Sequence, residues 1–139
     1  MKSGMDILIK GAQQIGIELG ESEQEKFRLY GELIKEWNKK INLVSYKGDE
    51  ELYRLHFLDS LICCTGYDFE NAIRVIDLGS GAGFPAIPLK ICFPNLQFCL
   101  VESRNKRCDF LQRVIELLDF KECFVIWDRI ENIAHQKEY

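Results

Sequence analysis

The feature that most constrains this chain is a short apolar run that ends in three closely spaced glycines. The stretch reads VIDLGSGAGFPAIPL over residues 75–89, with Gly79, Gly81 and Gly83 at every second position. The run before the glycines is short and rich in branched residues, which predicts a buried parallel strand. Because glycine has no Cβ, the loop can turn sharply and let a ligand approach the backbone. The spacing therefore predicts a nucleoside-binding turn between a strand and a helix.

The second half of the chain repeats the alternation of strand and helix. Apolar, β-rich runs at residues 73–79, 96–103 and 122–128 predict three strands, and residues 85–91 and 105–118 predict the helices between them. We expect the first strand to be buried on both faces. This order is one half of a doubly wound α/β fold with right-handed crossovers, and it predicts a Rossmann-like sheet of which the first three strands are present.

The first 70 residues have helical periodicity instead. One helix is expected over residues 5–17, and Ser22 with Glu25 has the spacing of a capping box before a second, longer helix. The apolar stripe of that second helix consists of Phe27, Tyr30, Leu33, Ile34, Trp37 and Ile41. A third helix is expected after Gly48 and Asp49, with an inward face made of Leu52, Leu55, Leu58, Leu61 and Ile62. We expect an N-terminal helical region at residues 1–70 and the first half of the sheet domain at residues 71–139.

Composition excludes several classes of protein. A chain of 139 residues with 29% charged residues and a net charge of −4 is typical of one globular domain, or a small domain with a helical attachment. No run reaches the roughly 18 to 20 apolar residues of a membrane span, and the N-terminus lacks a signal-peptide pattern. The sequence therefore predicts a cytoplasmic protein with no membrane partner.

The six cysteines have no metal-binding or redox spacing. Cys63 and Cys64 are adjacent, no CxxC pair occurs, and the others stand singly among apolar neighbours. The other four are Cys92, Cys99, Cys108 and Cys123. We therefore expect reduced, buried thiols and no metal site.

The glycines allow two registers, which predict different cofactors. The pattern Gly81-x-Gly83-x-x-Ala86 fits a dinucleotide fingerprint and would predict an NAD(P)-dependent oxidoreductase. The pattern Asp77-x-Gly79-x-Gly81-x-Gly83 resembles motif I of the S-adenosylmethionine-dependent methyltransferases. The carboxylate of Asp77 would repel a pyrophosphate, which favours the second register.

Two further residues bear on the ligand. Pro85, expected at the first helical position, removes an amide that an anion would use, and this also favours the methyltransferase register. Glu102 ends the second strand about 20 residues after the glycines, where an acid can accept hydrogen bonds from ribose hydroxyls in either class.

Four blocks of sequence carry a more specific resemblance. They are EWNKKINLVS at residues 36–45, HFLDSL at 56–61, VIDLGSGAGFPAIPL at 75–89 and LVESRNKRCDFL at 100–111. In this order they resemble the small-subunit ribosomal RNA methyltransferase G family. The resemblance implies S-adenosylmethionine as cofactor, methylation of N7 of a guanosine in 16S rRNA, and 16S rRNA or the small ribosomal subunit as partner.

The resemblance also assigns roles to residues of this chain. It implies that Gly79 and Phe84 line the cofactor pocket and that Asp77 and Glu102 hold the methionine and ribose ends of the cofactor. It further implies that Ile130 and Glu131 present backbone and side chain at the adenine edge. The chain departs from the family at Ala86, where glycine is common, and at Leu55, where a basic residue is usual.

The chemistry needs no general base, because guanine N7 already carries a free lone pair. We therefore nominate no catalytic residue and expect His56 to be structural, with Asp59 and Ser60 capping or bracing the glycine loop. The basic residues at the C-terminal end of the second strand are expected to contact RNA phosphates; they are Arg104, Lys106 and Arg107. A second basic group is expected to be a solvated helix face, and it consists of Lys35, Lys39 and Lys40.

Family members continue past the third strand, with further strands and an arginine after the fourth. The present sequence stops at Tyr139, so we expect a C-terminally short chain. A fragment of a whole enzyme, a truncated inactive form and a non-catalytic remnant all stay open at this point.

Overall fold

The computed structural model describes residues 3–63, 65–69, 71 and 74–133. The helical region contains α1 (Gly4–Gln14), α2 (Glu21–Asn38), α3 (Gly48–Glu51), the π-helical segment η1 (Leu52–Leu58) and α4 (Asp59–Ile62). The rest of the chain contains β1 (Arg74–Leu78), α5 (Ala86–Cys92), β2 (Gln97–Glu102), α6 (Asn105–Leu118), β3 (Cys123–Trp127) and α7 (Ile130–Ile133).

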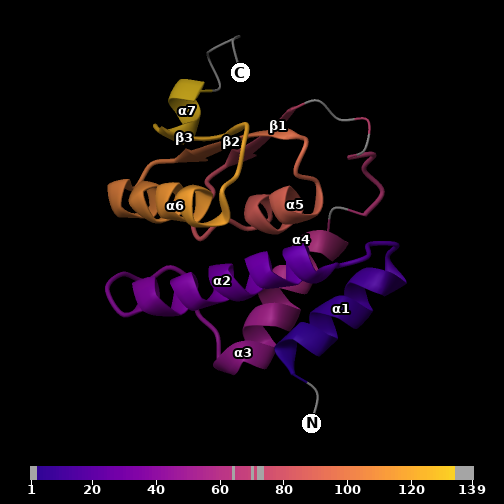
Figure 1. The fold of residues 1–139 in the computed structure, drawn as a ribbon. Helices are drawn as coiled ribbons and strands as arrows, with labels where there is room; N and C mark the ends of the chain where they lie inside the picture. The colour runs from indigo at the N-terminus through magenta and orange to yellow at the C-terminus, as the bar shows by residue number, and fades with distance from the viewer. Residues whose placement is uncertain (1–2, 64, 70, 72–73, 134–139) are drawn as a thin grey trace.

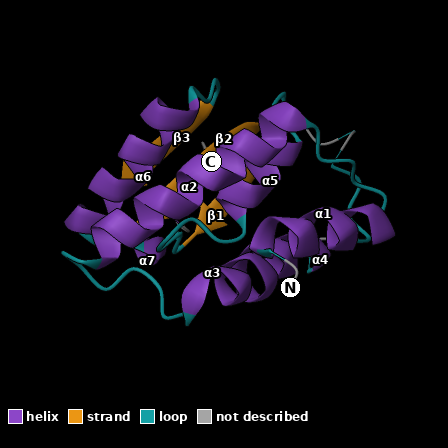
Figure 2. Cartoon of the chain, turned by 60° about the horizontal axis from the view of Figure 1, so that its bottom comes forward, coloured by secondary structure: helices purple, strands orange, loops and turns teal. Residues whose placement is uncertain are grey.

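The three strands form one parallel sheet in the order β1-β2-β3, and the pairing is fully in register. Asp77 of β1 lies beside Leu100 of β2, which in turn lies beside Val125 of β3. Both crossover helices, α5 and α6, lie on the same side of the sheet, and α2 packs beneath them (Figure 1). Seen from below, the strands lie behind these three helices (Figure 2). The predicted Rossmann-like α/β sheet with three strands is confirmed.

The core runs continuously from the helical region into the sheet. On the helix-covered side of the sheet, Phe98 and Leu100 are fully buried in one cluster with residues of α1, α2 and α5. Aromatic rings connect the layers, since Tyr30 of α2 stacks on Phe57 of η1 at 5.2 Å and lies 6.5 Å from the ring of Phe110 in α6. The helices of the first 62 residues therefore position the sheet directly.

The opposite side of the sheet is apolar and largely uncovered. A small cluster there is built on Cys99 and Val101, with Ile76 and Ile126 packed against it. In the described part of the chain only the one-turn α7 lies near this side (Figure 1). The prediction that β1 is buried on both faces is wrong for this chain, because Leu78 is 49% exposed.

The helix starts differ from the sequence prediction. Ser3 and Asp6 make the capping box of α1, where each side chain binds the backbone amide of the other. The predicted capping box at Ser22 is wrong, because the N-cap of α2 is Gly20, two residues earlier, and the helix starts at Glu21. Placed inside the first turn, the Ser22 hydroxyl accepts from Lys26 instead.

The π-helical segment explains why part of the predicted inward face is wrong. Buried positions step from Leu52 to Phe57 and from Tyr53 to Leu58, which are spacings of five residues. A wide turn of this kind rotates the following residues relative to an α-helix. Leu55 and Ile62 were predicted to face inward, and each is 41% exposed.

The prediction of buried thiols holds for only some of the described cysteines, because Cys63 is exposed and Cys92 is only partly buried. Cys99, Cys108 and Cys123 are buried and reduced, and burial raises the pKa of the Cys108 and Cys123 thiols to about 11. No described helix is both long and apolar enough to cross a bilayer. Cys64 and Ile73, on which two predictions fall, lie outside the described residues.

The uncovered side of the sheet generates the first prediction. Replacing Leu78 and Phe124, each about half exposed, with lysine should lower the binding of an apolar fluorescent dye. The free energy of unfolding should change by less than about 1 kcal/mol, because both side chains already contact water. Tyr67→Lys, at an exposed position outside the sheet, is the control. Unchanged dye binding would show that this side is covered in solution.

Candidate nucleoside-binding site

The glycine loop leaves the C-terminal end of β1 and is anchored on the neighbouring strand. The backbone amides of Gly79 and Ser80 both donate to the carbonyl oxygen of Val101, at 2.9 and 3.1 Å. The Gly83 amide donates to the Ser80 carbonyl at 2.7 Å and closes the turn. Gly79, Gly81 and Gly83 have φ angles of +75°, +57° and +99°, a region that side chains disfavour. The alternating glycines are therefore required by backbone conformation.

The three glycines differ in what surrounds them. A Cβ on Gly83 would lie 2.5 Å from Cγ1 of Ile87 and 2.9 Å from the Tyr30 hydroxyl, so this glycine is needed for packing. A Cβ on Gly79 would meet only Ile130, at 3.6 Å, and one on Gly81 would have Arg107 Nη1 as its nearest side-chain atom, at 3.9 Å. Gly79 and Gly81 thus leave open space beside a bare backbone, which is the shape that a flat ligand needs.

Asp77 points into the base of this loop with one oxygen unpaired. Its Oδ2 atom is buried and has no hydrogen-bond partner among the described residues. Burial raises the pKa of Asp77 to about 6, and the nearby charge of Glu102 adds to the shift, whereas Ser80 and the Ala86 amide oppose it. An orphaned buried carboxylate oxygen is costly, and a cationic or hydrogen-bond-donating ligand would relieve that cost.

Glu102 joins the glycine loop to the start of α6. Its Oε1 atom accepts from the Gly81 amide and its Oε2 atom from the Arg104 amide, both at 2.8 Å, and the residue is only 4% exposed. Each oxygen keeps further acceptor capacity after these bonds, because a carboxylate has about four lone-pair sites. The carboxylate therefore fixes the loop and still offers acceptors towards the site.

Tyr30 contributes to the loop and was predicted only as a core residue of its helix. Its hydroxyl donates to the Ala82 carbonyl at 2.5 Å, and burial, with the charge of Asp77 as a smaller cause, raises the pKa of Tyr30. The side chain thus stays a neutral donor that braces the loop from α2. Its place in an apolar stripe gave no signal of this contact, because the partner lies 52 residues away along the chain.

His56 and Phe84 form a stacked pair beside the loop. Their ring centroids are 5.2 Å apart with an interplanar angle of 18°, and His56 Nε2 lies 3.1 Å from the Ser45 carbonyl. A carbonyl only accepts, so this nitrogen donates, and the structural role of His56 stays a prediction that agrees with these contacts. The prediction that Ser60 braces the glycine loop is wrong, because its hydroxyl donates to the His56 carbonyl within its own helical segment. Pro85 is the N-cap of α5 rather than its first residue.

The remaining predicted residues gather at the same end of the sheet. Ile130 starts α7 within reach of Gly79, and Glu131 follows it on the surface. Arg104, the N-cap of α6, and Lys106 are exposed and Arg107 is partly buried, and the first turn of α6 has no acidic residue. Their binding roles stay predictions. Among the described residues, no group of three or more His, Cys, Asp or Glu side chains is placed to hold a metal ion.

Comparisons with known proteins give the chain its relatives. The family model described as rRNA small subunit methyltransferase G matches residues 23–139. Ribosomal RNA small subunit methyltransferase G of Dictyoglomus thermophilum is 41% identical over 133 residues, which cover 96% of this chain and 55% of the relative. The protein of that name from Clostridium botulinum (strain Eklund 17B) is 43% identical over 132 residues, with 95% and 55% covered. The chain thus spans about half the length of the curated relatives it matches.

One solved structure shares the fold at low sequence identity. It is that of a Plasmodium falciparum protein described as a protein-L-isoaspartate O-methyltransferase, in complex with S-adenosyl-L-homocysteine. The two superpose with a TM-score of 0.54 and 18% identity, covering 99% of this chain and 67% of the other. This likeness supports the assignment of the sheet topology.

The unequal surroundings of the glycines generate the second prediction. Gly83→Ala should lower the free energy of unfolding by about 3 kcal/mol, because its Cβ would overlap Ile87 and Tyr30 at a positive φ. Gly81→Ala should cost only about 1 kcal/mol, the strain of the left-handed region alone. Urea titrations followed by circular dichroism measure both. Equal losses would mean that the two glycines serve the same purpose.

The buried carboxylate of Asp77 generates the third prediction. Its pKa is 3.8 in an unfolded chain and about 6 in the fold, so the folded state binds more protons between these values. The free energy of unfolding due to this group therefore falls as the pH rises from about 4 to about 6. Asp77→Asn should raise stability at pH 7 by at most about 3 kcal/mol and have little effect below pH 4. Equal effects at both pH values, measured by urea titration, would contradict this assignment.

Proposed function

Because the chain belongs to the rRNA small subunit methyltransferase G family, we propose that it binds S-adenosylmethionine on the glycine loop. We propose further that it serves methyl transfer to N7 of a guanosine in 16S rRNA. The chain spans about half the length of its relatives, and we propose that it corresponds to their cofactor-binding part. The small ribosomal subunit or its free 16S rRNA is the proposed partner, and the cytoplasm is the proposed location.

One observation carries the cofactor proposal. The open backbone at Gly79 and Gly81 follows Asp77, which has an unpaired buried oxygen, and the Gly81 amide donates to the carboxylate of Glu102. A ligand with a cationic amino acid end, a ribose and a flat base matches this order of groups. Asp77 would hold the amino acid end, Glu102 the ribose hydroxyls, and Ile130 with Glu131 the adenine edge. Phe84 would line the pocket from its position after the third glycine.

A dinucleotide fits the same geometry less well. A pyrophosphate beside Gly81 and Gly83 would lie close to the carboxylates of Asp77 and Glu102, which are near enough for the charge of one to raise the pKa of the other. The helix that would cap the phosphates is also short, and its N-cap is Pro85, which has no amide hydrogen. The two carboxylates and the missing amide donor at Pro85 therefore both favour a cationic nucleoside over a pyrophosphate.

The residues of this site position and shield reactants rather than transfer protons. When bound, S-adenosylmethionine supplies a methyl group on a positively charged sulfur. The lone pair of N7 needs no deprotonation, so the chain has to align the nucleophile with the sulfur–methyl bond and exclude water. The Nε2–H of His56 is engaged by Ser45, consistent with a structural role for this ring. Arg104 and Lys106 would contact RNA phosphates beside the loop.

Calorimetry with S-adenosylhomocysteine tests the proposal and gives the fourth prediction. The chain should bind this compound and not NAD. Gly81→Ala should weaken the affinity about tenfold or more, because its methyl group would occupy the space of the ligand. Gly16→Ala is a matched control, since Gly16 also has a positive φ, +83°, with open space around it, but lies at the end of α1. Preference for NAD, or equal effects of the two variants, would contradict the proposed site.

A further inference from the structure

We propose that the loop at residues 39–46, the α2–α3 loop, is the second half of the RNA-binding surface, opposite the basic first turn of α6. This inference rests on the proposed function, because it names where the RNA strand would lie beside the same glycine loop. The sequence alone suggested that the lysines at the end of α2 are only a solvated helix face.

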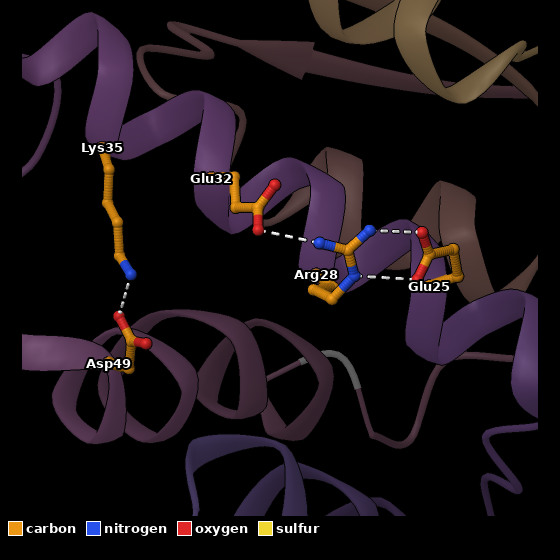
Figure 3. Close-up of polar contacts among 5 residues, drawn as sticks. All are labelled: Glu25, Arg28, Glu32, Lys35 and Asp49. Atoms are coloured by element: carbon orange, nitrogen blue, oxygen red, sulfur yellow. Dashed lines mark hydrogen bonds and ion pairs between the residues drawn. The ribbon is translucent and has the colours of Figure 1, made fainter.

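The charges along α2 fall into two groups. Two cations in the middle of the helix are compensated within the protein, and the first is Arg28, which pairs with Glu25 at 2.5 Å and with Glu32 at 2.7 Å. Lys35 crosses to Asp49 of α3 at 2.6 Å (Figure 3). Lys39 and Lys40, which follow directly, are exposed and form no ion pair with any described residue. The C-terminal end of α2 therefore carries two neighbouring cations that no described acidic side chain pairs.

That end of α2 lies against the start of α6. Trp37 packs edge-on to Phe110 with ring centroids 5.6 Å apart, and the ammonium of Lys40 lies 5.8 Å from the Trp37 ring centroid. The view in Figure 1 shows the loop after α2 projecting below the first turn of α6. Lys39 and Lys40 therefore share one end of the molecule with Arg104 and Lys106, although some 65 residues of sequence separate the two pairs.

Arg107 connects the two basic segments. Its Nη2 atom donates to the Asn42 carbonyl at 3.2 Å, and its Nη1 atom lies 3.9 Å from the position of a Cβ on Gly81. The guanidinium thus bridges the α2–α3 loop and the glycine loop. This contact makes Arg107 a tether between the two segments, in addition to its predicted contact with phosphate.

The α2–α3 loop has a fixed shape because Asn38 holds it. The side-chain oxygen of Asn38 accepts from the amides of Leu43 and Val44, at 2.9 and 3.2 Å, and its nitrogen donates to the Val44 carbonyl at 2.9 Å. Further along, the Ser45 carbonyl accepts from His56, whose ring stacks on Phe84. The side chains of Asn38, His56 and Arg107, which come from three different elements, therefore fix the loop next to the proposed cofactor site.

A nucleic acid backbone is the partner that this surface fits. The protein is acidic overall, with a net charge of −4. A local group of exposed cations without ion pairs therefore has the opposite sign to the net charge of the protein. Phosphate contacts fix the register of a strand without reading its sequence. Two basic segments joined through Arg107 beside the glycine loop would hold the strand next to the proposed cofactor site.

Charge reversal tests the surface and gives the fifth prediction. The probe is a short fluorescent RNA hairpin with a guanosine in its loop, and the readout is the slope of log affinity against log salt. The Lys39→Glu/Lys40→Glu variant should lower the magnitude of that slope by about 1 to 2. The Lys10→Glu/Lys26→Glu variant makes the same change in net charge on α1 and the first half of α2, and should keep the slope. Affinity for S-adenosylhomocysteine should not change in either.

The outcomes separate this inference from the proposed function. An unchanged slope in the Lys39/Lys40 variant, or no RNA binding by the unaltered chain, overturns the inference whether or not the homocysteine compound binds. If the slope responds and that compound does not bind, the RNA surface stands and the cofactor proposal fails.

An uncharged variant tests the shape of the loop separately from its charge. Asn38→Ala removes three hydrogen bonds within the loop and should speed amide hydrogen exchange at Leu43 and Val44. It should weaken RNA binding roughly threefold, because the strand would then have to order the loop. Asn95→Ala, at an exposed position between α5 and β2, is the control. Faster exchange with unchanged RNA affinity would overturn the proposed role of the loop.

Discussion

The carboxylate of Glu102 is the contact on which the site depends. Through one oxygen it holds the Gly81 amide, and through the other it holds the amide that precedes α6. A single buried side chain thus sets the conformation of the glycine loop and the direction in which the basic first turn of α6 leaves the sheet. The proposed cofactor site and the proposed RNA-binding surface therefore share one origin at the end of β2.

The helical region is part of this arrangement rather than an appendage. Tyr30 reaches from α2 to the carbonyl of Ala82, and His56 reaches from η1 to the ring of Phe84. Both contacts act on residues between or directly after the glycines. The stability of the loop therefore depends on packing between segments that are distant in sequence, while its open backbone at Gly79 stays available to a ligand.

The buried carboxylate of Asp77 lowers the stability of the fold when it is ionised. An ionised carboxylate with an unpaired oxygen lowers stability above pH 6, as its raised pKa indicates. Such a cost is typical of binding sites, where a group is left unsatisfied until the ligand arrives.

The apolar side of the sheet around Val101 differs from that of most parallel sheets, which are normally covered on both sides. Helices α5 and α6 cover one side of this sheet, and among the described residues only α7 lies near the other (Figure 1).

The sequence by itself determined the alternation of strands and helices and the positions of the glycine loop and Glu102. These depend on local periodicity and on residue types at short spacing, so they can be recognised without a structure. Tertiary structure decided the rest. The π-helical turn of η1 moved Leu55 to the surface, since residue spacing gives no sign of a wide turn. The contacts of Tyr30 with Ala82 and of Arg107 with Asn42 also needed the fold, because each joins residues more than 50 positions apart.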